Sequence, residues 1–289
     1  MKKLKILCIA MAAIVLSSVS LNSNAQGFYI NAGLGYGFNA ASQVIGTNYT
    51  KTTDGSGNTT TTTTNVKGSY AAGLNFGAIF GYMFNEHISG EIGINYLSGS
   101  TTTTTNSHTD SASSDVFTMG TKATMLRIIP AIKISGEPGT VTPYLKAGLV
   151  LGLSGKITNT VNGTSTTLGT SDVYAGTEEY TGGTSIGFMG AVGIDYKLSD
   201  MFSIYGEIGM IGATWAPTVM NVTAYTINGV DQLAQNNTSE KQTTFSSSTT
   251  TSSNVNPSPG SPTQSLQSFE PFSSWGINIG VHLTFVGKK

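Results

Sequence analysis

The last segment of the chain, residues 273–286, alternates between apolar and small or polar residues over a dozen positions. Its apolar face would carry Trp275, Ile277, Ile279, Val281, Leu283 and Phe285. A period of two is that of a β-strand, and an average strand runs only about five or six residues. A strand that crosses a bilayer at a tilt needs ~9 to 11 residues. The length of this segment therefore indicates a membrane-crossing strand.

The same alternation recurs in seven further segments. These are residues 28–38, 70–84, 88–96, 124–134, 143–153, 186–198 and 202–212. In each segment one face is apolar, whereas the other is mostly glycine, asparagine or another small or polar residue. An apolar lipid-facing side that alternates with a small or polar lumen side is the pattern of a transmembrane barrel. With the last segment, the pattern predicts eight strands.

The connections between these segments alternate between long and short. The long ones are residues 39–69, 97–123, 154–185 and 213–272, and the short ones are residues 85–87, 135–142 and 199–201. Transmembrane barrels place long loops outside the cell and short turns in the periplasm. We therefore expect an all-β fold: an eight-stranded antiparallel up-and-down transmembrane β-barrel with long extracellular hairpin loops and both termini in the periplasm.

The long connections are rich in threonine, with runs at residues 59–64, 101–105 and 243–253. Such low-complexity sequence can be disordered, but threonine is β-branched and fits a pleated strand. Asn-Gly and Asp-Gly pairs favour hairpin turns, and the long connections contain them at residues 54–55, 162–163 and 228–229. We predict hairpins with tips at these pairs and an irregular, proline-containing segment at residues 254–264.

Residues 1–25 have the pattern of a secretory signal peptide. Lysines precede an apolar stretch, and Ser23-Asn24-Ala25 is a small-x-Ala cleavage site. The mature domain is then residues 26–289, an outer-membrane β-barrel. Cys8 is the only cysteine and lies inside the predicted signal, so we expect no disulfide and no thiol chemistry in the mature protein.

The eight alternating strands, the three short turns, the signal and the aromatic-bearing last strand resemble the small outer-membrane β-barrel proteins of the OmpA and OmpX type. The resemblance implies a location in the outer membrane and contact with its lipid. It also implies that the barrel-assembly machinery reads the last strand, where Phe285 occupies the place of the family's terminal aromatic residue. We expect no separate cell-wall-binding domain after the barrel.

Aromatic residues near the ends of the predicted strands would form girdles at the two membrane boundaries. The girdle residues are Phe28, Phe38, Tyr70, Phe84, Tyr96, Tyr196, Phe202, Trp275 and Phe285.

Four charged residues fall on the predicted lumen face: Glu91, Arg127, Lys146 and Glu207. Side chains just fill the interior of an eight-stranded barrel, and a buried charge without a partner is costly. We therefore predict a structural network in which two carboxylates meet two cations in the lower or middle lumen. A transport path along the lumen is the alternative.

Composition and motifs give little support to other chemistry. Only 10% of the residues are charged, and the mature chain would hold 11 basic against 15 acidic residues after loss of three signal lysines. No basic patch indicates nucleic acid. His87, His108 and His282 lack metal-ligand spacing, so we expect no metal and no cofactor. The residue types of a hydrolase site occur at residues 107–111, but chance explains them in a threonine-rich loop, and we expect no catalysis.

The leading functional hypothesis is a monomeric barrel with a plugged lumen that displays polar loops for structural or surface-interaction, adhesin-like roles. A narrow porin or carrier for small solutes is the second hypothesis. An outer-membrane enzyme that modifies lipid is a remote third.

Overall fold

The computed structural model describes residues 27–40, 42–249 and 260–286, and these are almost entirely β-strand. The predicted signal peptide, with Cys8 and the cleavage site, lies outside the described residues. Within the described ranges, no helix combines the length and the apolar character that a membrane-spanning helix requires.

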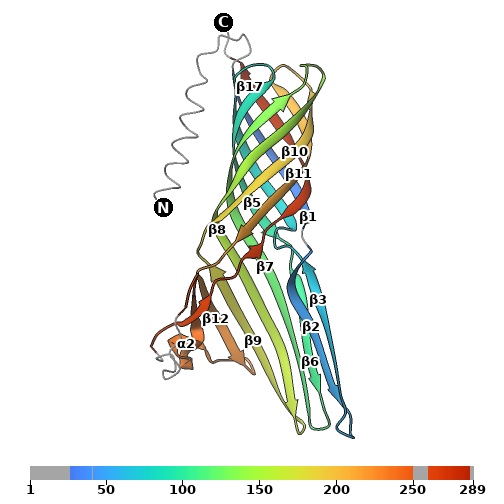
Figure 1. Cartoon of the computed structure of the whole chain (residues 1–289), viewed down its shortest axis with the longest axis vertical. Helices are drawn as coiled ribbons and strands as arrows, with labels where there is room; N and C mark the ends of the chain where they lie inside the picture. Colours follow the sequence, from blue (N-terminus) through green and yellow to red (C-terminus); the bar gives the residue numbers. More distant parts are fainter. Residues whose placement is uncertain (1–26, 41, 250–259, 287–289) are drawn as a thin grey trace.

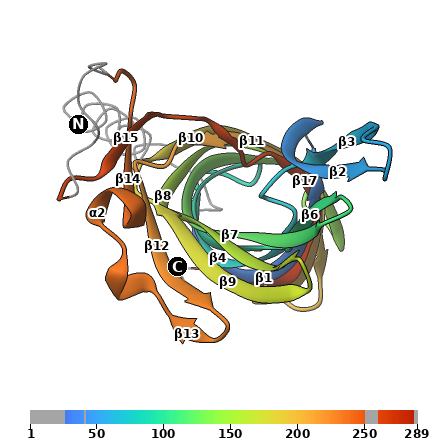
Figure 2. The ribbon, with the colours of Figure 1, turned by 90° about the horizontal axis from the view of Figure 1, so that it is seen from below.

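Eight strands pair side by side into a closed ring (Figures 1 and 2). In ring order they are β1 (Gly27–Asn39), β4 (Gly73–Met83), β5 (Ile88–Gly99), β7 (Ser113–Ser135), β8 (Val141–Thr167), β10 (Ser185–Lys197), β11 (Phe202–Trp215) and β17 (Ser274–Val286). Every neighbouring pair is antiparallel, and β17 pairs back with β1. The predicted eight-stranded up-and-down barrel is confirmed.

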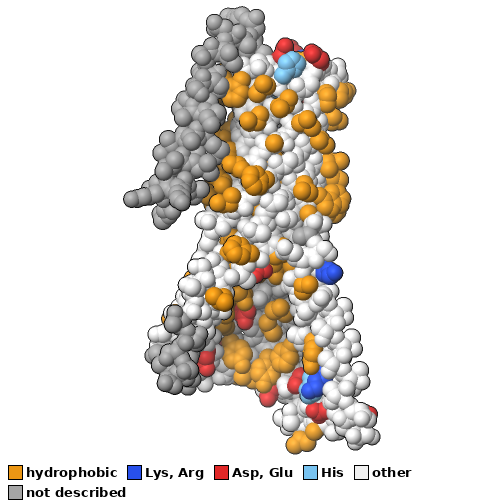
Figure 3. Space-filling model, in the orientation of Figure 1, with side chains coloured by type: hydrophobic (Ala, Val, Ile, Leu, Met, Phe, Trp, Pro, Cys, Tyr) orange, Lys and Arg blue, Asp and Glu red, His pale blue; other side chains and the backbone are white. Residues whose placement is uncertain are grey.

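The two alternating sets of residues in each strand lie on opposite sides of the barrel wall. Apolar side chains of the barrel strands cover its outer wall (Figure 3), among them Phe28 and Phe188, which are 66% and 69% exposed. The residues between them point inward, and Tyr29 beside Phe28 is only 1% exposed. A wall with large apolar groups outside and buried polar groups inside is the reverse of a water-soluble barrel, and it suits lipid.

Beyond the barrel, the sheet continues into long hairpins at the end opposite the short turns (Figure 1). The hairpin strands are β2 (Gln43–Thr53), β3 (Thr59–Gly68), β6 (Thr102–Thr109), β9 (Thr170–Thr181) and β12 (Val219–Ile227), together with the far halves of β7 and β8. β2 pairs with β3, β6 with β7, β8 with β9, and β9 with β12. We call these strands the hairpin crown, and they confirm hairpins for the threonine runs at residues 59–64 and 101–105. The third run, residues 243–253, begins in a strand with a parallel partner and ends outside the described residues.

The long connection before the last strand holds only short elements. They are β13 (Val230–Asp231), the 3-10 helix η2 (Leu233–Gln235), α2 (Thr238–Lys241), β14 (Gln242–Ser246), β15 (Thr263–Leu266) and β16 (Glu270–Pro271). The segment predicted to be irregular lies mostly outside the described residues, and its last two residues begin β15. That strand pairs in parallel with β14, which supplies the partner that local sequence did not reveal.

Two of the three predicted hairpin tips are correct and one is wrong. A turn separates β2 from β3 at residues 54–58, and Asn228 and Gly229 form the β12–β13 turn with positive φ. The β8–β9 turn instead lies at Leu168 and Gly169, which have φ values of 50° and 84°. Asn162 and Gly163 are inside β8 and pair with strands on both sides. Two ladders of hydrogen bonds override the turn preference of an Asn-Gly pair.

Candidate functional site

The lumen contains a layer of ionised side chains near its middle, centred on Lys146. Lys146 Nζ lies 3.0 Å from Glu91 Oε2 and 2.9 Å from Glu207 Oε2. Tyr29 donates a hydrogen bond to Glu91 over 2.7 Å, and Tyr144 donates one to Glu207 over 3.1 Å. Three of the four predicted network residues therefore meet, and two tyrosines that the sequence analysis did not select complete their hydrogen bonding.

The fourth predicted network residue, Arg127, does not join the other three. Its guanidinium bonds to the side-chain oxygens of Asn75 and Asn95, and it makes no ion pair with a described carboxylate. Residue counting from the turns placed it too low, because neighbouring strands of a tilted barrel are staggered. In the actual register Arg127 is paired with Asn95, four residues beyond Glu91 towards the crown.

A second ion pair lies closer to the short turns. Lys133 Nζ is 2.6 Å from Asp195 Oδ2 and 4.1 Å from the centre of the Tyr144 ring. His282 faces the lumen as expected, and its ring stacks on Tyr29 with a centroid distance of 4.6 Å. The two layers place buried charged and aromatic side chains in the short-turn half of the lumen, although Asp195 Oδ1 and His282 Nδ1 form no hydrogen bond with a described residue there.

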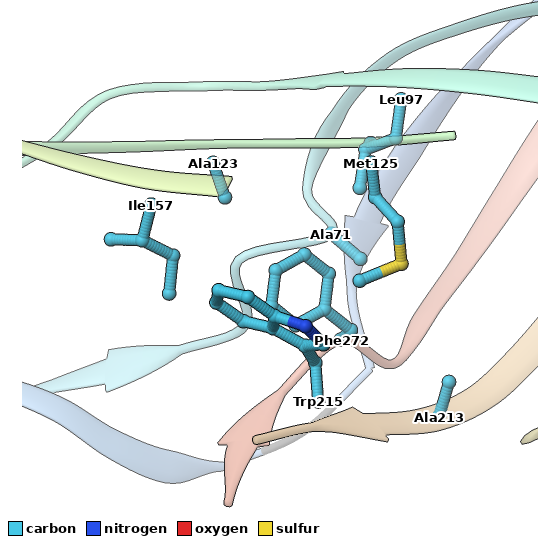
Figure 4. Packing of buried hydrophobic residues seen from close by; sticks show 8 residues of the cluster. All are labelled: Ala71, Leu97, Ala123, Met125, Ile157, Ala213, Trp215 and Phe272. Carbon is cyan, nitrogen blue, oxygen red and sulfur yellow. The ribbon is translucent and has the colours of Figure 1, made fainter. Parts of the chain in front are cut away.

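A cluster of buried apolar side chains, which we call the plug, lies inside the ring at the crown end (Figure 4). Trp215 from the end of β11 and Phe272 from the segment before β17 are each 1% exposed, and their rings meet edge to face with centroids 5.7 Å apart. The other members of this cluster are Ala71, Leu97, Ala123, Met125, Ile157 and Ala213. Tightly packed apolar groups of this kind leave little space between them. Buried side chains therefore lie inside the ring at two levels, the plug and the charged layers.

Between the plug and the charged layer lies a cavity of about 110 Å³. Arg127 and Tyr205 line it together with both carboxylates of the charged layer, Ser274 and several glycines. Glycine is needed where another group comes close to the backbone: a side chain at Gly33 would collide with the Tyr205 hydroxyl. Arg127 and Lys146 are the cations among the residues that line this cavity.

Beyond the plug, the strands of the hairpin crown form a curved sheet, and its concave side is a hollow that is open to the side in the space-filling view (Figure 3). Directly opposed residues of neighbouring strands share one face of a sheet. Tyr180 on β9 is opposite the plug residue Ile157, and Phe117 and Tyr174 are both opposite Gly163. Phe117 and Tyr174 pack with ring centroids 5.8 Å apart. The inner face of the crown is therefore aromatic.

Acidic groups accompany these aromatic residues. Glu178 shares the inner face with Tyr180, and no described Lys, Arg or His lies within ion-pair distance of it. Its neighbour Glu179 points away and pairs with Lys156 at 2.5 Å. Burial against the plug, followed by the charges of Glu178 and Glu270, raises the pKa of Tyr180 to about 12. The inner face of the crown thus combines aromatic surface with unneutralised carboxylate.

The serine, histidine and aspartate at residues 107–111 are not arranged as a hydrolase triad, in which serine, histidine and acid are hydrogen-bonded in series. His108 lies 3.8 Å from Asp110 and 3.6 Å from Asp115, whereas the Ser107 hydroxyl bonds to Thr50 on β2. Consecutive residues of a strand point to opposite faces, so Ser107 points away from His108. The described residues contain no group of three His, Cys, Asp or Glu side chains that could hold a metal ion.

The predicted girdle residues lie on the outer wall with one exception. Six are exposed there: Phe28, Phe38, Tyr96, Tyr196, Trp275 and Phe285. Phe84 and Phe202 are partly exposed near the short turns. Tyr70 is not a girdle residue, because the chain turns before β4 and its ring packs on Phe272 beside the plug, with its hydroxyl bonded to Ile45.

The plug was missed by sequence reasoning, although one signal for it exists. Leu97 and Met125 are large apolar residues at lumen-facing positions of β5 and β7, where small or polar residues are the rule. Two adjacent strands that both carry a large apolar residue at a lumen-facing position near the same end indicate an apolar contact inside the lumen. Trp215 and Phe272 carried no such signal because both fall in the predicted long connection, residues 213–272, although Trp215 is the last residue of β11.

The chain has similarity to a known protein family and to a solved structure. Residues 6–229 match the family described as outer membrane protein beta-barrel domain. The chain is similar to the outer membrane protein OprG from Pseudomonas aeruginosa, at 13% sequence identity and a TM-score of 0.40, over 92% of this chain and 99% of that chain. No curated protein matches. The family match spans well over half of the chain, and with the closed ring of eight antiparallel strands it makes this protein a member of the outer membrane β-barrel family.

Proposed function

We propose that this outer membrane β-barrel protein is a closed barrel that serves as a rigid base for the hairpin crown, and that the crown is its interaction surface. The observation that supports the proposal is that two groups of buried side chains lie inside the barrel at different levels. The apolar plug around Trp215 and Phe272 and the ion network around Lys146 both cross the lumen axis. A solute would have to displace both layers, so passage through the lumen is not the best use of this geometry.

The crown supports the same proposal. β7 and β8 each run on from the barrel into the crown as one strand, and their pairing continues beyond a register shift between Leu126 and Arg127, so the same sheet carries the hairpins and the barrel wall. An ordered surface loses little conformational entropy on binding. Exposed aromatic side chains are common at binding sites because they offer a large contact area with few rotatable bonds. The concave inner face with Phe117, Tyr174 and Tyr180 is the part of the crown that fits a ligand best.

The remaining expectations about the protein form part of the proposal. The crown faces the outside of the cell, the apolar wall contacts outer-membrane lipid, and the barrel-assembly machinery reads β17 during insertion. The barrel acts as a monomer, without a catalytic reaction or a cofactor. A structural role in the envelope is compatible with the same closed barrel.

Planar-bilayer recordings of the refolded protein test the proposal. We expect no steady conductance from the wild-type protein, because the plug and the ion network remain in place. Steady single-channel conductance of the wild-type protein would favour the second candidate, a narrow channel or carrier. The cavity of about 110 Å³ between the two closures is the observation that favours that candidate.

A further inference from the structure

The floor of the crown hollow, beside the plug, carries aromatic rings. Tyr180 on β9 and Phe245 on β14 have ring centroids 6.0 Å apart and ring planes inclined by 20°. Tyr180 and Tyr70 both pack against the plug, where the Tyr70 ring lies 6.0 Å from that of Phe272. Tyr70, Tyr180 and Phe245 are only partly buried. The floor therefore offers aromatic surface that the described part of the chain leaves partly uncovered.

Two carboxylates lie beside these rings. Glu178 is on the same face of β9 as Tyr180, and the Tyr180 hydroxyl donates to Glu178 Oε2 over 3.5 Å. Glu270 is directly opposite Trp215, whose side chain is in the plug, so Glu270 shares the inner face of the sheet. Burial raises the pKa of Tyr70 to about 12, and the charge of Glu270 is the next cause. The same charge contributes to the raised pKa of Tyr180, so both carboxylates act on one floor.

The described residues do not neutralise these carboxylates. No described Lys, Arg or His lies within ion-pair distance of Glu178 or Glu270. Glu178 Oε2 accepts only from Tyr180, and Glu270 Oε1 accepts from the Ser268 hydroxyl over 2.8 Å. Within the described ranges, Glu178 Oε1 and Glu270 Oε2 have no side-chain donor. Each carboxylate therefore keeps an oxygen that can accept from a ligand.

The basic side chains that the strand pairing places on the inner face lie farther out. Lys51 is opposite His108, and the same row of the sheet continues through β7 and β8 to Asp172 on β9. Six residues of β9, roughly 20 Å, separate Asp172 from Glu178. The floor is therefore aromatic and acidic, and Figure 3 shows apolar and acidic side chains together on the surface of the hollow.

We propose that the floor of the crown binds a small organic ammonium cation with an aromatic body, such as a phenylalkylamine. The ammonium group donates to Glu178, and Glu270 adds negative charge beside it. The aromatic body packs against the rings of Tyr180 and Phe245, whose faces also attract the cation. A primary ammonium suits the site better than a quaternary one because the free carboxylate oxygens need donors. This inference rests on the proposal that the crown is the interaction surface, and it adds the chemical class of the ligand.

Calorimetric titration of the refolded mature protein in a neutral detergent tests the site with three matched probes. Phenethylamine is a cation at neutral pH. In 2-phenylethanol a hydroxyl replaces the ammonium group at nearly the same size, and ethylamine keeps the ammonium group without the ring. We expect phenethylamine to bind about tenfold more tightly than either of the others, because only phenethylamine uses both the carboxylates and the rings.

Two neighbouring residues of β9 provide a variant and its control. Glu178→Gln keeps the shape of the side chain and removes its charge, so it should raise the Kd of phenethylamine to that of 2-phenylethanol. Glu179→Gln changes the next residue, which points to the other face and pairs with Lys156, and it should leave the preference for phenethylamine unchanged. Equal affinity of the wild-type protein for phenethylamine and 2-phenylethanol would overturn the proposal, and so would a preference that persists in Glu178→Gln.

A second measurement keeps the test decisive if Glu178→Gln does not fold. Crystals of the wild-type protein grown with 4-bromophenethylamine should show an anomalous bromine peak in contact with Tyr180 or Phe245. A crystal in which this peak is missing, or lies only on the outer wall of the barrel, would contradict the assignment.

Planar-bilayer recordings separate this inference from the proposed function on which it rests. A barrel without conductance that shows no preference for phenethylamine would overturn the ligand class and leave the closed barrel in place. A conducting barrel that still prefers phenethylamine through Glu178 would support the site and overturn the closed barrel.

Discussion

Replacement of Lys146 by methionine tests the ion network most directly. The change keeps most of the length of the side chain, which becomes one atom shorter, and it removes the charge, which leaves Glu91 and Glu207 near each other without a cation. The three side chains are 4%, 1% and 6% exposed, so water screens them little. Each lysine–carboxylate contact at about 3 Å corresponds to roughly 5 kcal/mol at an effective dielectric constant of about 20, and desolvation offsets much of this.

Removal of one member of a buried ion pair costs about 3–5 kcal/mol in measured cases. Two stranded carboxylates would lie at the upper end of that range, and the hydrogen bonds from Tyr29, Tyr144 and Asn278 move the value towards the lower end. We therefore expect Lys146→Met to lower the free energy of unfolding by about 3–5 kcal/mol. Urea titration of the refolded barrel in vesicles, followed by tryptophan fluorescence, measures this quantity.

The matched control is Lys156→Met in the crown. Its pair with Glu179 is equally short but exposed, with side chains 41% and 29% accessible, so the same substitution should cost only about 0.2–1 kcal/mol. The triple variant Glu91→Gln, Lys146→Met, Glu207→Gln removes all three charges and should recover most of the loss. If Lys146→Met costs no more than Lys156→Met, or if the triple variant is less stable than the single one, the network does not stabilise the barrel as argued.

Three further predictions address the plug, the topology and a turn. Phe272→Ala should lower the free energy of unfolding by about 3–5 kcal/mol and give measurable conductance in planar bilayers. The control Phe269→Ala, at a position 71% exposed, should change neither quantity. Conductance of Phe272→Ala that stays at zero would mean that the ion network closes the lumen alone. Protease added to intact cells should cut near the crown tip at residues 54–58 and spare the short turn at residues 199–201; the opposite pattern would reverse the orientation of the barrel. Gly169→Val should destabilise the β8–β9 hairpin by roughly 1–2 kcal/mol because Gly169 has a φ of 84°, and a hydrogen-exchange rate of β9 amides no faster than in the Gly55→Val control would contradict this.

The barrel could be predicted from the sequence because successive residues of a strand point to opposite faces. A strand with lipid on one face and the lumen on the other therefore alternates between apolar and small or polar residues. β1 and β17 are examples, since nearly every lumen position between their apolar residues is glycine, asparagine, serine or histidine. The meeting of Glu91, Lys146 and Glu207 followed from the same alternation. The position of Arg127 along the lumen axis could not be predicted in this way, because it depends on the stagger between neighbouring strands. The plug did not follow either, because Phe272 returns into the lumen from a long connection that has no period.

The register of β1 with β17 has a consequence for the order of assembly. The strand that begins at Gly27 pairs with the strand that ends at Val286, so the ring joins the two ends of the described chain. Bringing such distant segments together carries the largest loop-closure entropy of any pairing in the sheet, and contacts of high sequence separation form slowly. Until β17 arrives, β1 and β11 each present a row of unpaired backbone groups that lipid cannot satisfy. The incomplete barrel therefore needs its two open edges to be shielded until β17 pairs with them. Misfolding is a risk for as long as those edges stay unpaired.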